Sequence, residues 1–214
     1  MIIGAALGVA VLGGVLLLRS ERGKESFRPA TSKPSPTADQ TPPAPAGVVT
    51  LEEFGDYQCP PCGALHPGLK QLKKDLGPNL NFVFRNFPLT PIHKNAMAAA
   101  QAAEAARMQD HFWEMHDLLY ENQSLWQEDI NPKSIFVKFA SDLGLNLWLF
   151  RRDFDGEQVK LRIEADREAA AKLGIEGTPT ILIEGRQLRP ELTTLEGIRK
   201  GIELMMSRKT SPAP

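Results

Sequence analysis

The chain contains two cysteines, Cys59 and Cys62, in the stretch FGDYQCPPCGALHPGL, where two prolines separate them. A C-x-x-C pair serves three kinds of chemistry: metal binding, covalent haem attachment and thiol-disulfide exchange. Haem attachment requires a histidine directly after the second cysteine, and that position is Gly63. A structural zinc site requires four ligands, and the histidines show no paired ligand spacing beside a second C-x-x-C. Thiol-disulfide exchange is therefore the favoured chemistry, and metal binding with His66 as the third ligand is the alternative.

The residues around the pair predict a helix that begins at the first thiol. Cys59 lies near the expected N-cap, Pro60 suits the first helical position, and Gly77 ends the helix. A helix N-terminus carries partial positive charge and free N–H groups, which lower the pKa of a thiol. Cys59 is therefore the expected nucleophile, and Cys62, one turn further, is more shielded but close enough to attack a mixed disulfide. Pro60 and Pro61 remove two N–H donors and stiffen the loop, so we predict a reactive but moderated site.

The composition limits the kinds of partner that the protein is expected to bind. Lys and Arg number 25 and Asp and Glu number 26, so the charge is nearly balanced and no nucleic-acid partner is expected. Without its two ends the chain keeps about 160 residues, enough for one domain that buries a core without disulfides. No cofactor and no resident metal are expected, and recognition is predicted to be local and apolar.

The N-terminus is predicted to be a separate piece. Residues 2–18 contain only Ile, Gly, Ala, Leu and Val, and at about 1.5 Å per residue such a helix just crosses a bilayer core. No small-residue cleavage site precedes Arg19, so a membrane anchor or signal-anchor is predicted over residues 1–18 and a Pro-rich linker over 19–46.

The charges around this segment argue against export of the domain that follows it. Basic residues follow the apolar run, and a simple positive-inside count would leave the domain in the cytoplasm. That rule is weak for a single segment ahead of a long domain. We therefore predict a protein of the cell envelope, held to the membrane through residues 2–18, with its catalytic domain outside the cytoplasm.

Apolar periodicity and turn residues predict the elements outside the active-site helix. Strands are predicted over residues 48–54, 80–87 and 180–184, a short strand before Pro190, and helices over 158–173 and up to about 206. A capping box of Thr193 with Glu196 is expected to begin the last helix. Residues 208–214 are predicted to be a disordered tail.

Residues 93–156 are predicted to be a helical block. The run KNAMAAAQAAEAAR has strong helix propensity, and HFWEMHDLLYEN places His116 on an apolar stripe. Asn131 and Asn146 are expected to begin further helices in this block. The tryptophans are expected to pack its interior, namely Trp113, Trp126 and Trp148.

Without the helical block, the order of elements is that of the thioredoxin fold. The chain resembles the DsbA-like branch of thioredoxin-fold thiol-disulfide oxidoreductases, especially its membrane-tethered members. The resemblance is carried by FGDYQCPPC, FRNFPL, AAAQAAEAARMQDHFWEMHDLL and GTPT, in that order. It implies an α/β protein whose thioredoxin domain comprises residues 47–92 and 157–207. The helical insertion, residues 93–156, then lies between the second strand and the second thioredoxin helix.

The resemblance also implies roles for single residues. Cys59 would be the nucleophile, Cys62 the resolving thiol, and Pro179 the cis-proline packed opposite them, with Thr178 before it lining the substrate. Glu53 stands where relatives place a buried acid that shuttles the proton of the second cysteine.

Other positions beside the pair are open to more than one interpretation. Pro61 occupies the place where the best-known strong oxidants carry histidine, which leaves the oxidising strength open. Pro60, Pro61 and His66 are further candidates to face the substrate. His66 could instead tune the thiolate or be an exposed surface histidine.

The favoured function is a dithiol oxidase that forms disulfides in reduced, exported proteins and is reoxidised by a membrane redox partner. A reductase or isomerase of the same chemistry is one alternative. A copper-binding chaperone that uses Cys59, Cys62 and His66 is the other.

Overall fold

The computed structural model describes residues 47–210. The predicted anchor and linker, residues 1–46, and residues 211–214 lie outside this range. Within it, every helix is too short or too polar to cross a bilayer.

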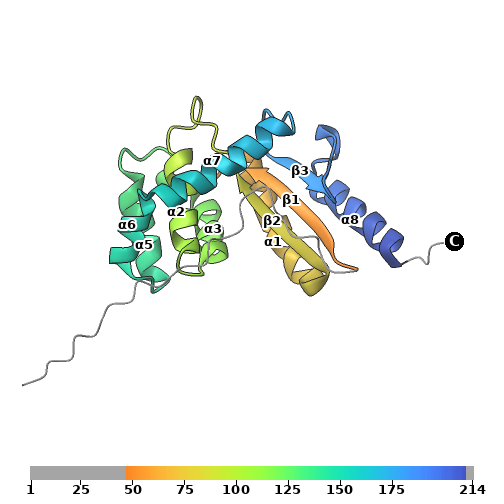
Figure 1. Ribbon diagram of the computed structural model, residues 1–214, viewed down its shortest axis with the longest axis horizontal. Coiled ribbons are helices and arrows are strands. Elements are labelled where there is room, and N and C mark those ends of the chain that lie inside the picture. Colours follow the sequence, from red (N-terminus) through yellow and green to blue (C-terminus); the bar gives the residue numbers. More distant parts are fainter. Residues whose placement is uncertain (1–46, 211–214) are drawn as a thin grey trace, which may run out of the picture. The chain divides into compact units, whose positions relative to one another are not determined.

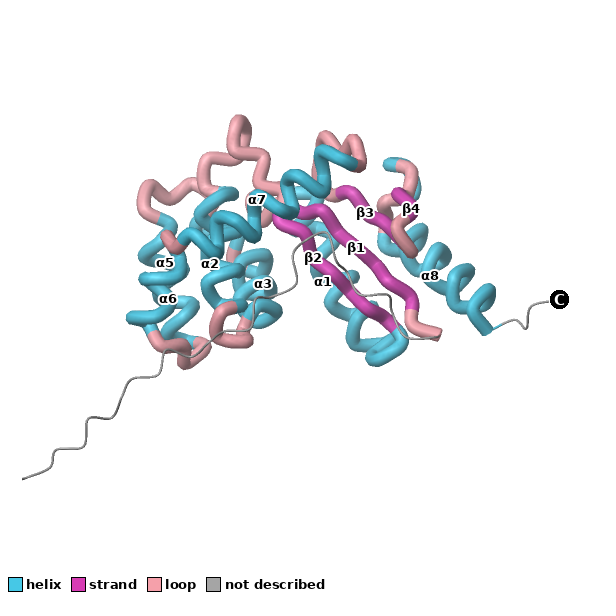
Figure 2. Tube along the Cα trace, viewed as in Figure 1, coloured by secondary structure: helices cyan, strands magenta, loops and turns pink. Residues whose placement is uncertain are grey.

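A mixed four-stranded sheet forms the centre of the thioredoxin domain (Figure 2). The strands are β1 (Val49–Gly55), β2 (Leu80–Asn86), β3 (Thr180–Ile183) and β4 (Arg186–Gln187), and their order in the sheet is β2-β1-β3-β4. β1 runs parallel to β2 and antiparallel to β3, with Glu53 opposite both Phe84 and Ile181. The three longer predicted strands and the short fourth strand are confirmed.

Helices cover both faces of this sheet (Figure 1). Alternate residues of a strand point to opposite faces. On one face, Leu51 packs with residues of α1 (Pro60–Leu76) and α8 (Leu195–Thr210), such as Leu69 and Ile198. On the other, Phe54 packs against α7 (Glu157–Lys172) through Ala170. Glu53, two residues after Leu51, therefore lies on the face that α1 covers.

The helical insertion is confirmed and is grouped around one alanine-rich helix (Figure 1). Its helices are α2 (Ala96–Arg107), α3 (Phe112–Glu121), α4 (Gln123–Trp126), α5 (Pro132–Asp142) and α6 (Leu147–Phe154). Small alanine side chains on α2 let its neighbours approach closely, and the apolar cluster that results also contains Cys59 and Cys62. The insertion therefore forms part of the packing behind the two thiols.

Some local predictions were wrong. Trp148 is 64% exposed instead of packing the insertion, with the Arg152 guanidinium over its ring. The last helix is capped by Thr194, whose hydroxyl accepts the Gly197 N–H at 3.1 Å, because a 3-10 turn at Pro190–Leu192 takes up Thr193. The same helix continues to Thr210, beyond the expected domain end at residue 207.

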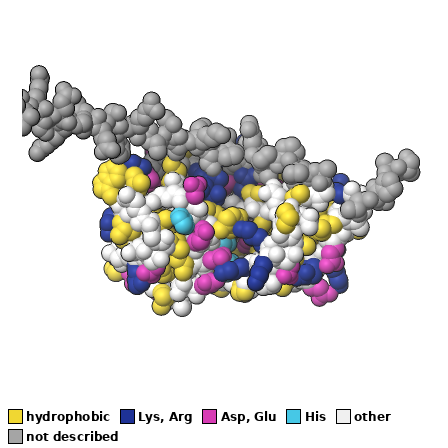
Figure 3. All heavy atoms as spheres, turned by 90° about the horizontal axis from the view of Figure 1, so that it is seen from below, with side chains coloured by type: hydrophobic (Ala, Val, Ile, Leu, Met, Phe, Trp, Pro, Cys, Tyr) yellow, Lys and Arg dark blue, Asp and Glu magenta, His cyan; other side chains and the backbone are white. Residues whose placement is uncertain are grey.

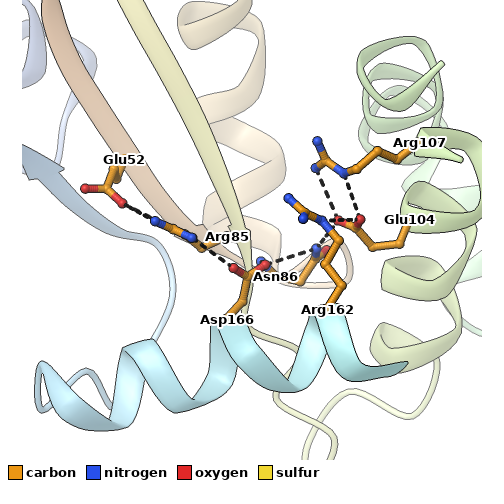
Figure 4. A network of polar contacts seen from close by, with 7 residues as sticks. All are labelled: Glu52, Arg85, Asn86, Glu104, Arg107, Arg162 and Asp166. Carbon is orange, nitrogen blue, oxygen red and sulfur yellow. Dashed lines mark hydrogen bonds and ion pairs between the residues drawn. The ribbon is translucent and has the colours of Figure 1, made fainter. Parts of the chain in front are cut away.

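A buried polar network joins the insertion to the sheet (Figure 4). Glu104 of α2, which is 1% exposed, accepts a hydrogen bond from the Asn86 side chain at 2.7 Å. It also pairs with Arg107 and with Arg162 of α7, both at 2.7 Å. Asp166 of α7 accepts the Asn86 backbone N–H at 2.9 Å. Each buried charge in this network therefore has an opposite charge or a donor beside it, as burial requires.

Candidate active site

Cys59 stands at the N-cap of α1, as the sequence predicted. Its backbone is extended, with φ −71° and ψ 121°, while Pro60 and Pro61 begin the helix and are exposed. The Cys59 N–H donates to the Asp56 carbonyl at 3.0 Å, and its own carbonyl accepts the Gly63 N–H at 3.1 Å. The two thiols are unpaired and buried, Cys59 with 4% and Cys62 with 0% of its surface exposed.

The two thiols differ in acidity. A hydrogen bond from the Cys62 thiol is the main reason that the pKa of Cys59 is lowered to about 6, and it outweighs the effect of burial. Burial raises the pKa of Cys62 far above its ordinary value, and its hydrogen bond to Cys59 adds to that shift. Near neutral pH, Cys59 is therefore the thiolate and Cys62 the protonated thiol.

Glu53 is a buried acid on the face of β1 that α1 covers. It is 2% exposed, and its Oε1 has no hydrogen-bond partner among residues 47–210. Burial, together with the negative charge of Cys59, raises the pKa of Glu53 to about 8. This carboxyl group therefore carries a proton at neutral pH.

The loop before β3 lies against the first thiol. The Thr178–Pro179 peptide bond is cis, and the Thr178 carbonyl oxygen lies 3.4 Å from Cys59 Sγ. A shallow groove of about 510 Å³ begins beside this contact and is mostly apolar. Its lining comprises Pro61, Ala64, Leu65, Pro179, Thr180, Gln187, Leu188, Pro190, Thr193 and Leu195. The structure thus brings Pro61 and Pro179 together on one side of the pair.

His66 does not lie with these groove residues. It is 4% exposed and stacks on Tyr120, with ring centroids 5.0 Å apart, and the ring of His116 lies 5.3 Å away. The interpretation as an exposed surface histidine was wrong, because α1 turns this side chain toward the insertion. Among the described residues, the one group of three potential ligands close enough to share a metal ion joins His66 to His116 and Asp117, without either cysteine.

Sequence reasoning missed Gln123, a residue of the insertion. Its Nε2 donates to the carbonyl of Tyr57 at 2.6 Å and to that of Cys59 at 3.1 Å. Its Oε1 would lie 2.6 Å from a Cβ added to Gly63, so that position tolerates only hydrogen without movement. No local pattern signals this contact, since it joins residues more than sixty positions apart.

A second missed contact fixes the turn before the pair. Asp56 is buried, and its carboxylate accepts the N–H groups of Gln58 at 2.7 Å and Leu89 at 2.8 Å. The ring of His93 lies 2.8 Å from the same carboxylate. His93 therefore supports the active-site turn.

Comparison with known proteins agrees with this geometry. A family model described as thioredoxin matches residues 44–203. A thioredoxin-like oxidoreductase from Silicibacter pomeroyi DSS-3 superposes with a TM-score of 0.65 at 26% identity, covering 82% of this chain and 97% of that one. BdbD from Bacillus subtilis gives 0.65 at 25% identity, covering 76% and 89%. Pseudomonas aeruginosa DsbA gives 0.62 at 16% identity, covering 83% and 89%, which shows the same fold.

The curated relatives are much longer proteins. A Na+/H+ antiporter NhaA 1 of Salinispora arenicola is 39% identical over 139 residues, which are 65% of this chain and 20% of that protein. NhaA 1 of Mycolicibacterium gilvum is 31% identical over 156 residues, or 72% and 24%. This chain spans about a fifth of the first of these relatives. The family model that matches residues 44–203 shows that this chain belongs to the thioredoxin family. Its fold is that of the thioredoxin-like oxidoreductase, BdbD and DsbA structures.

Proposed function

We propose that this protein is a dithiol oxidase that forms disulfides in exported proteins. The observation that carries the proposal is the unequal acidity of the pair, with the pKa of Cys59 lowered to about 6 and that of Cys62 raised. Whatever stabilises the Cys59 thiolate also stabilises the reduced protein. A pair with a stabilised reduced form is the stronger oxidant, because it gains more free energy when it accepts electrons.

The exchange takes place in two displacements. A substrate thiolate attacks the Cys59 sulfur of the Cys59–Cys62 disulfide, so that a mixed disulfide forms and Cys62 leaves as a thiolate, which takes up a proton. A second substrate thiolate then attacks the substrate sulfur of the mixed disulfide and releases Cys59 as a thiolate. The substrate loses two electrons, and the pair gains them.

Glu53 supplies the proton in the first displacement. Its pKa of about 8 keeps the carboxyl group protonated at neutral pH, and it influences Cys62 electrostatically from the adjacent strand. A Cys62 thiolate is costly where it is buried, so a nearby proton donor favours its departure. In the reverse direction, the Glu53 carboxylate accepts the proton when Cys62 attacks.

The groove beside Pro61 and Pro179 receives the substrate chain. Its lining is mostly apolar, and exposed Pro60 and the Thr178 carbonyl flank the reacting sulfur. On the face in Figure 3, Lys and Arg side chains lie interspersed with Asp and Glu. Recognition then depends on apolar side chains near the substrate cysteine, and a reduced, unfolded chain exposes such side chains.

Residues 2–18 hold the domain at the membrane, outside the cytoplasm. Their composition suits a membrane-spanning helix, and an oxidising compartment is where disulfides persist. A membrane redox partner accepts two electrons from the reduced pair, Cys62 gives up its proton, and the disulfide is restored.

The redox state of the pair in cells tests the direction of exchange. Cells are quenched with acid, and the free thiols of the protein are alkylated with a reagent that shifts its mass. A dithiol oxidase is mainly disulfide under these conditions. A mainly dithiol protein would instead be a reductase or isomerase, and thiols protected by metal until a chelator is added would indicate the copper chaperone.

The assignment of the attacking thiol has its own test. Cys62→Ser leaves Cys59 able to form mixed disulfides that no second thiol resolves, so these complexes should accumulate and disappear on reduction. Cys59→Ser should trap almost none, because the remaining thiol is buried and its pKa is raised. Equal trapping by both variants would contradict the assignment.

A further inference from the structure

A second cluster of side chains that could bind a metal ion lies between α1 and α3, two helices that pack against each other (Figure 1). One potential ligand atom from each of His66, His116 and Asp117 lies within 4.8 Å of the other two. His66 Nε2 is 3.6 Å from Asp117 Oδ1 and 3.9 Å from Glu121 Oε1. Two imidazoles and one carboxylate are thus close enough to share one ion, and the Glu121 carboxylate lies beside His66.

The central atom of this cluster lacks a hydrogen bond. His66 Nε2 is buried and has no hydrogen-bond partner in the described part of the chain. The His66 side chain is 4% exposed, and a buried polar atom without a partner costs on the order of 1–3 kcal/mol. Asp117 and Glu121 are 27% and 47% exposed, so the cluster opens to solvent on its acidic side.

We propose that His66, His116 and Asp117 bind a divalent transition-metal ion such as Zn²⁺, with Glu121 as the fourth ligand. Zinc binds imidazole nitrogen and carboxylate oxygen at about 2.0–2.2 Å, and ligand atoms in a tetrahedron are then about 3.3 Å apart. The distances of 3.6 and 3.9 Å around His66 Nε2 need only small side-chain movements to reach that value. The mixed nitrogen and oxygen donor set suits zinc better than calcium or magnesium.

The surroundings also fit a metal site. The Tyr57 hydroxyl lies 3.1 Å from His116 Nδ1 and holds the ring in place, as outer-shell hydrogen bonds do for metal-binding histidines. The cluster shares α1 with the active site but uses neither cysteine.

Lys70 occupies the outer side of the same carboxylates. Its ammonium group is 2.8 Å from Asp117 Oδ2 and 2.6 Å from Glu121 Oε1. The Lys70 side chain is 48% exposed, so it can swing into solvent when a metal ion takes over the charge balance. Lys70 and the metal ion therefore compete, and removal of this lysine should strengthen metal binding.

The test uses the full chain with Cys59→Ser and Cys62→Ser, so that no thiol can bind the metal. Zn²⁺ is titrated in competition with a chromogenic chelator. One equivalent should bind, and His66→Gln or Asp117→Asn should weaken binding about 10-fold or more. His111→Gln is the matched control, because this histidine is 40% exposed and lies outside the cluster. Its affinity should be unchanged.

Two further measurements keep the test independent of folding defects. Lys70→Met changes a half-exposed side chain and should tighten Zn²⁺ binding, whereas unchanged or weaker binding would overturn the proposal. Co²⁺ in the thiol-free chain should give the visible absorption of a tetrahedral nitrogen and oxygen site, without a thiolate charge-transfer band. No Zn²⁺ binding by the thiol-free chain, or binding that His66→Gln and Asp117→Asn leave unchanged, would equally overturn it.

Discussion

Cys59 and Cys62 are one helical turn apart and both are buried, yet their acidities differ in opposite directions. The difference arises from their places in the helix. Cys59 is the N-cap, where a side chain can accept free N–H groups of the first turn, whereas Cys62 lies within that turn and donates its proton toward Cys59. The asymmetry therefore follows from position, since both residues are cysteine.

Glu53 provides a prediction at the residue scale. Its pKa is raised from 4.5 to about 8 in the folded protein, mainly by burial. A raised carboxyl pKa stabilises the folded state below the unfolded pKa, and this contribution is lost as the pH rises through the folded pKa. The Glu53→Gln side chain has no proton to lose, so the unfolding free energy of the variant should not fall in this way. Between pH 5 and pH 8 the unfolding free energy of the variant should therefore rise by about 3 kcal/mol relative to that of wild type.

Urea denaturation of the reduced proteins across this pH range measures the difference. Glu168→Gln, which changes an exposed glutamate of α7, is the control and should follow wild type at every pH. Parallel pH profiles for wild type and Glu53→Gln would show that this carboxyl group titrates normally. Because burial is the main cause, most of the effect should persist in the oxidised protein.

The residues that sequence could identify are those that local rules constrain. The C-x-x-C pair and the proline after the N-cap each stand at a position with its own pattern, whereas the role expected of Glu53 came from the family resemblance. The contacts of Gln123 and the contact between Asp56 and His93 were not predicted, because they join distant segments whose side chains meet only after the insertion folds. His66 was recognised as a candidate, but a helix pattern alone did not reveal which side it faces.

At the scale of elements, the first turn of α1 determines how strongly the thiolate is held. An N-cap side chain accepts hydrogen bonds from the N–H groups of the second and third helical residues. The second is Pro61, which has no N–H, so among these two groups only Cys62 can donate to Cys59. We therefore expect the prolines to moderate the site.

Pro61→His should raise the reduction potential. It restores one backbone donor and adds an imidazole, and a hydrogen bond to a charged group contributes about 1.5–3 kcal/mol. Since about 30 mV corresponds to 1.4 kcal/mol for a two-electron couple, the increase should be about 30 mV or more. A glutathione redox titration measures it, with thiolate absorbance followed against pH.

Pro61→Ala separates the two contributions, because it restores the N–H without a side-chain donor. Its potential should lie between those of wild type and Pro61→His. If neither variant exceeds the wild-type potential, the helix terminus and Glu53 determine the redox poise, and the dipeptide between the cysteines does not.

The contact between α4 and α1 predicts that the effect of Gly63→Ala on stability changes sign when Gln123 is removed. Gly63→Ala places a methyl group against the Gln123 amide, 2.6 Å from Oε1, and should break the two hydrogen bonds of that amide, each contributing about 1 kcal/mol. In a Gln123→Ala background those bonds are already lost. There the same change should stabilise the helix by up to about 1 kcal/mol, as alanine does relative to glycine.

A double-mutant cycle of unfolding free energies tests this coupling. The effect of Gly63→Ala should be unfavourable or neutral in wild type and favourable in Gln123→Ala. The same sign and size in both backgrounds would show that Gln123 does not restrict this position.

The boundaries of the helices show where local sequence signals are enough to predict the structure. The start of α1 and the Asn146 cap of α6 were predicted, since the capping residue and its donors are neighbours in sequence. The last helix began one residue later than expected, because a 3-10 turn fixed the chain before it. Trp148 proved exposed, since an aromatic in a short helix packs only if its face meets a neighbour.

At the scale of the whole described domain, the thioredoxin part and the insertion are joined by two kinds of contact. The apolar cluster around α2 includes both thiols, and the network in Figure 4 links α2 and α7 to the end of β2. Opposite charges from different segments meet in this network, so we expect it to favour one way for the insertion to pack. Sequence predicted the insertion as a block but could not show which charged residues would hold it.

Glu104 tests how far the two parts depend on each other. Glu104→Ala leaves Arg107 and Arg162, which are 24% and 23% exposed, without this carboxylate and removes a buried acceptor from Asn86, so it should lower the unfolding free energy by about 2–3 kcal/mol. Glu128→Ala is the matched control in the insertion. That side chain is 77% exposed and pairs with Lys94 at the surface, so its loss should cost less than about 1 kcal/mol.

The order of unfolding distinguishes a loosened insertion from a uniform loss of stability. All three tryptophans lie in the insertion, so their fluorescence follows that part, whereas far-UV circular dichroism follows all the helices. In wild type the two urea transitions should coincide, because the network makes the parts unfold together. In Glu104→Ala the fluorescence transition should come at lower urea, since the insertion has lost its charged contact with Asn86 and Arg162. Coincident transitions with an unchanged midpoint would show that the apolar cluster alone holds the insertion in place.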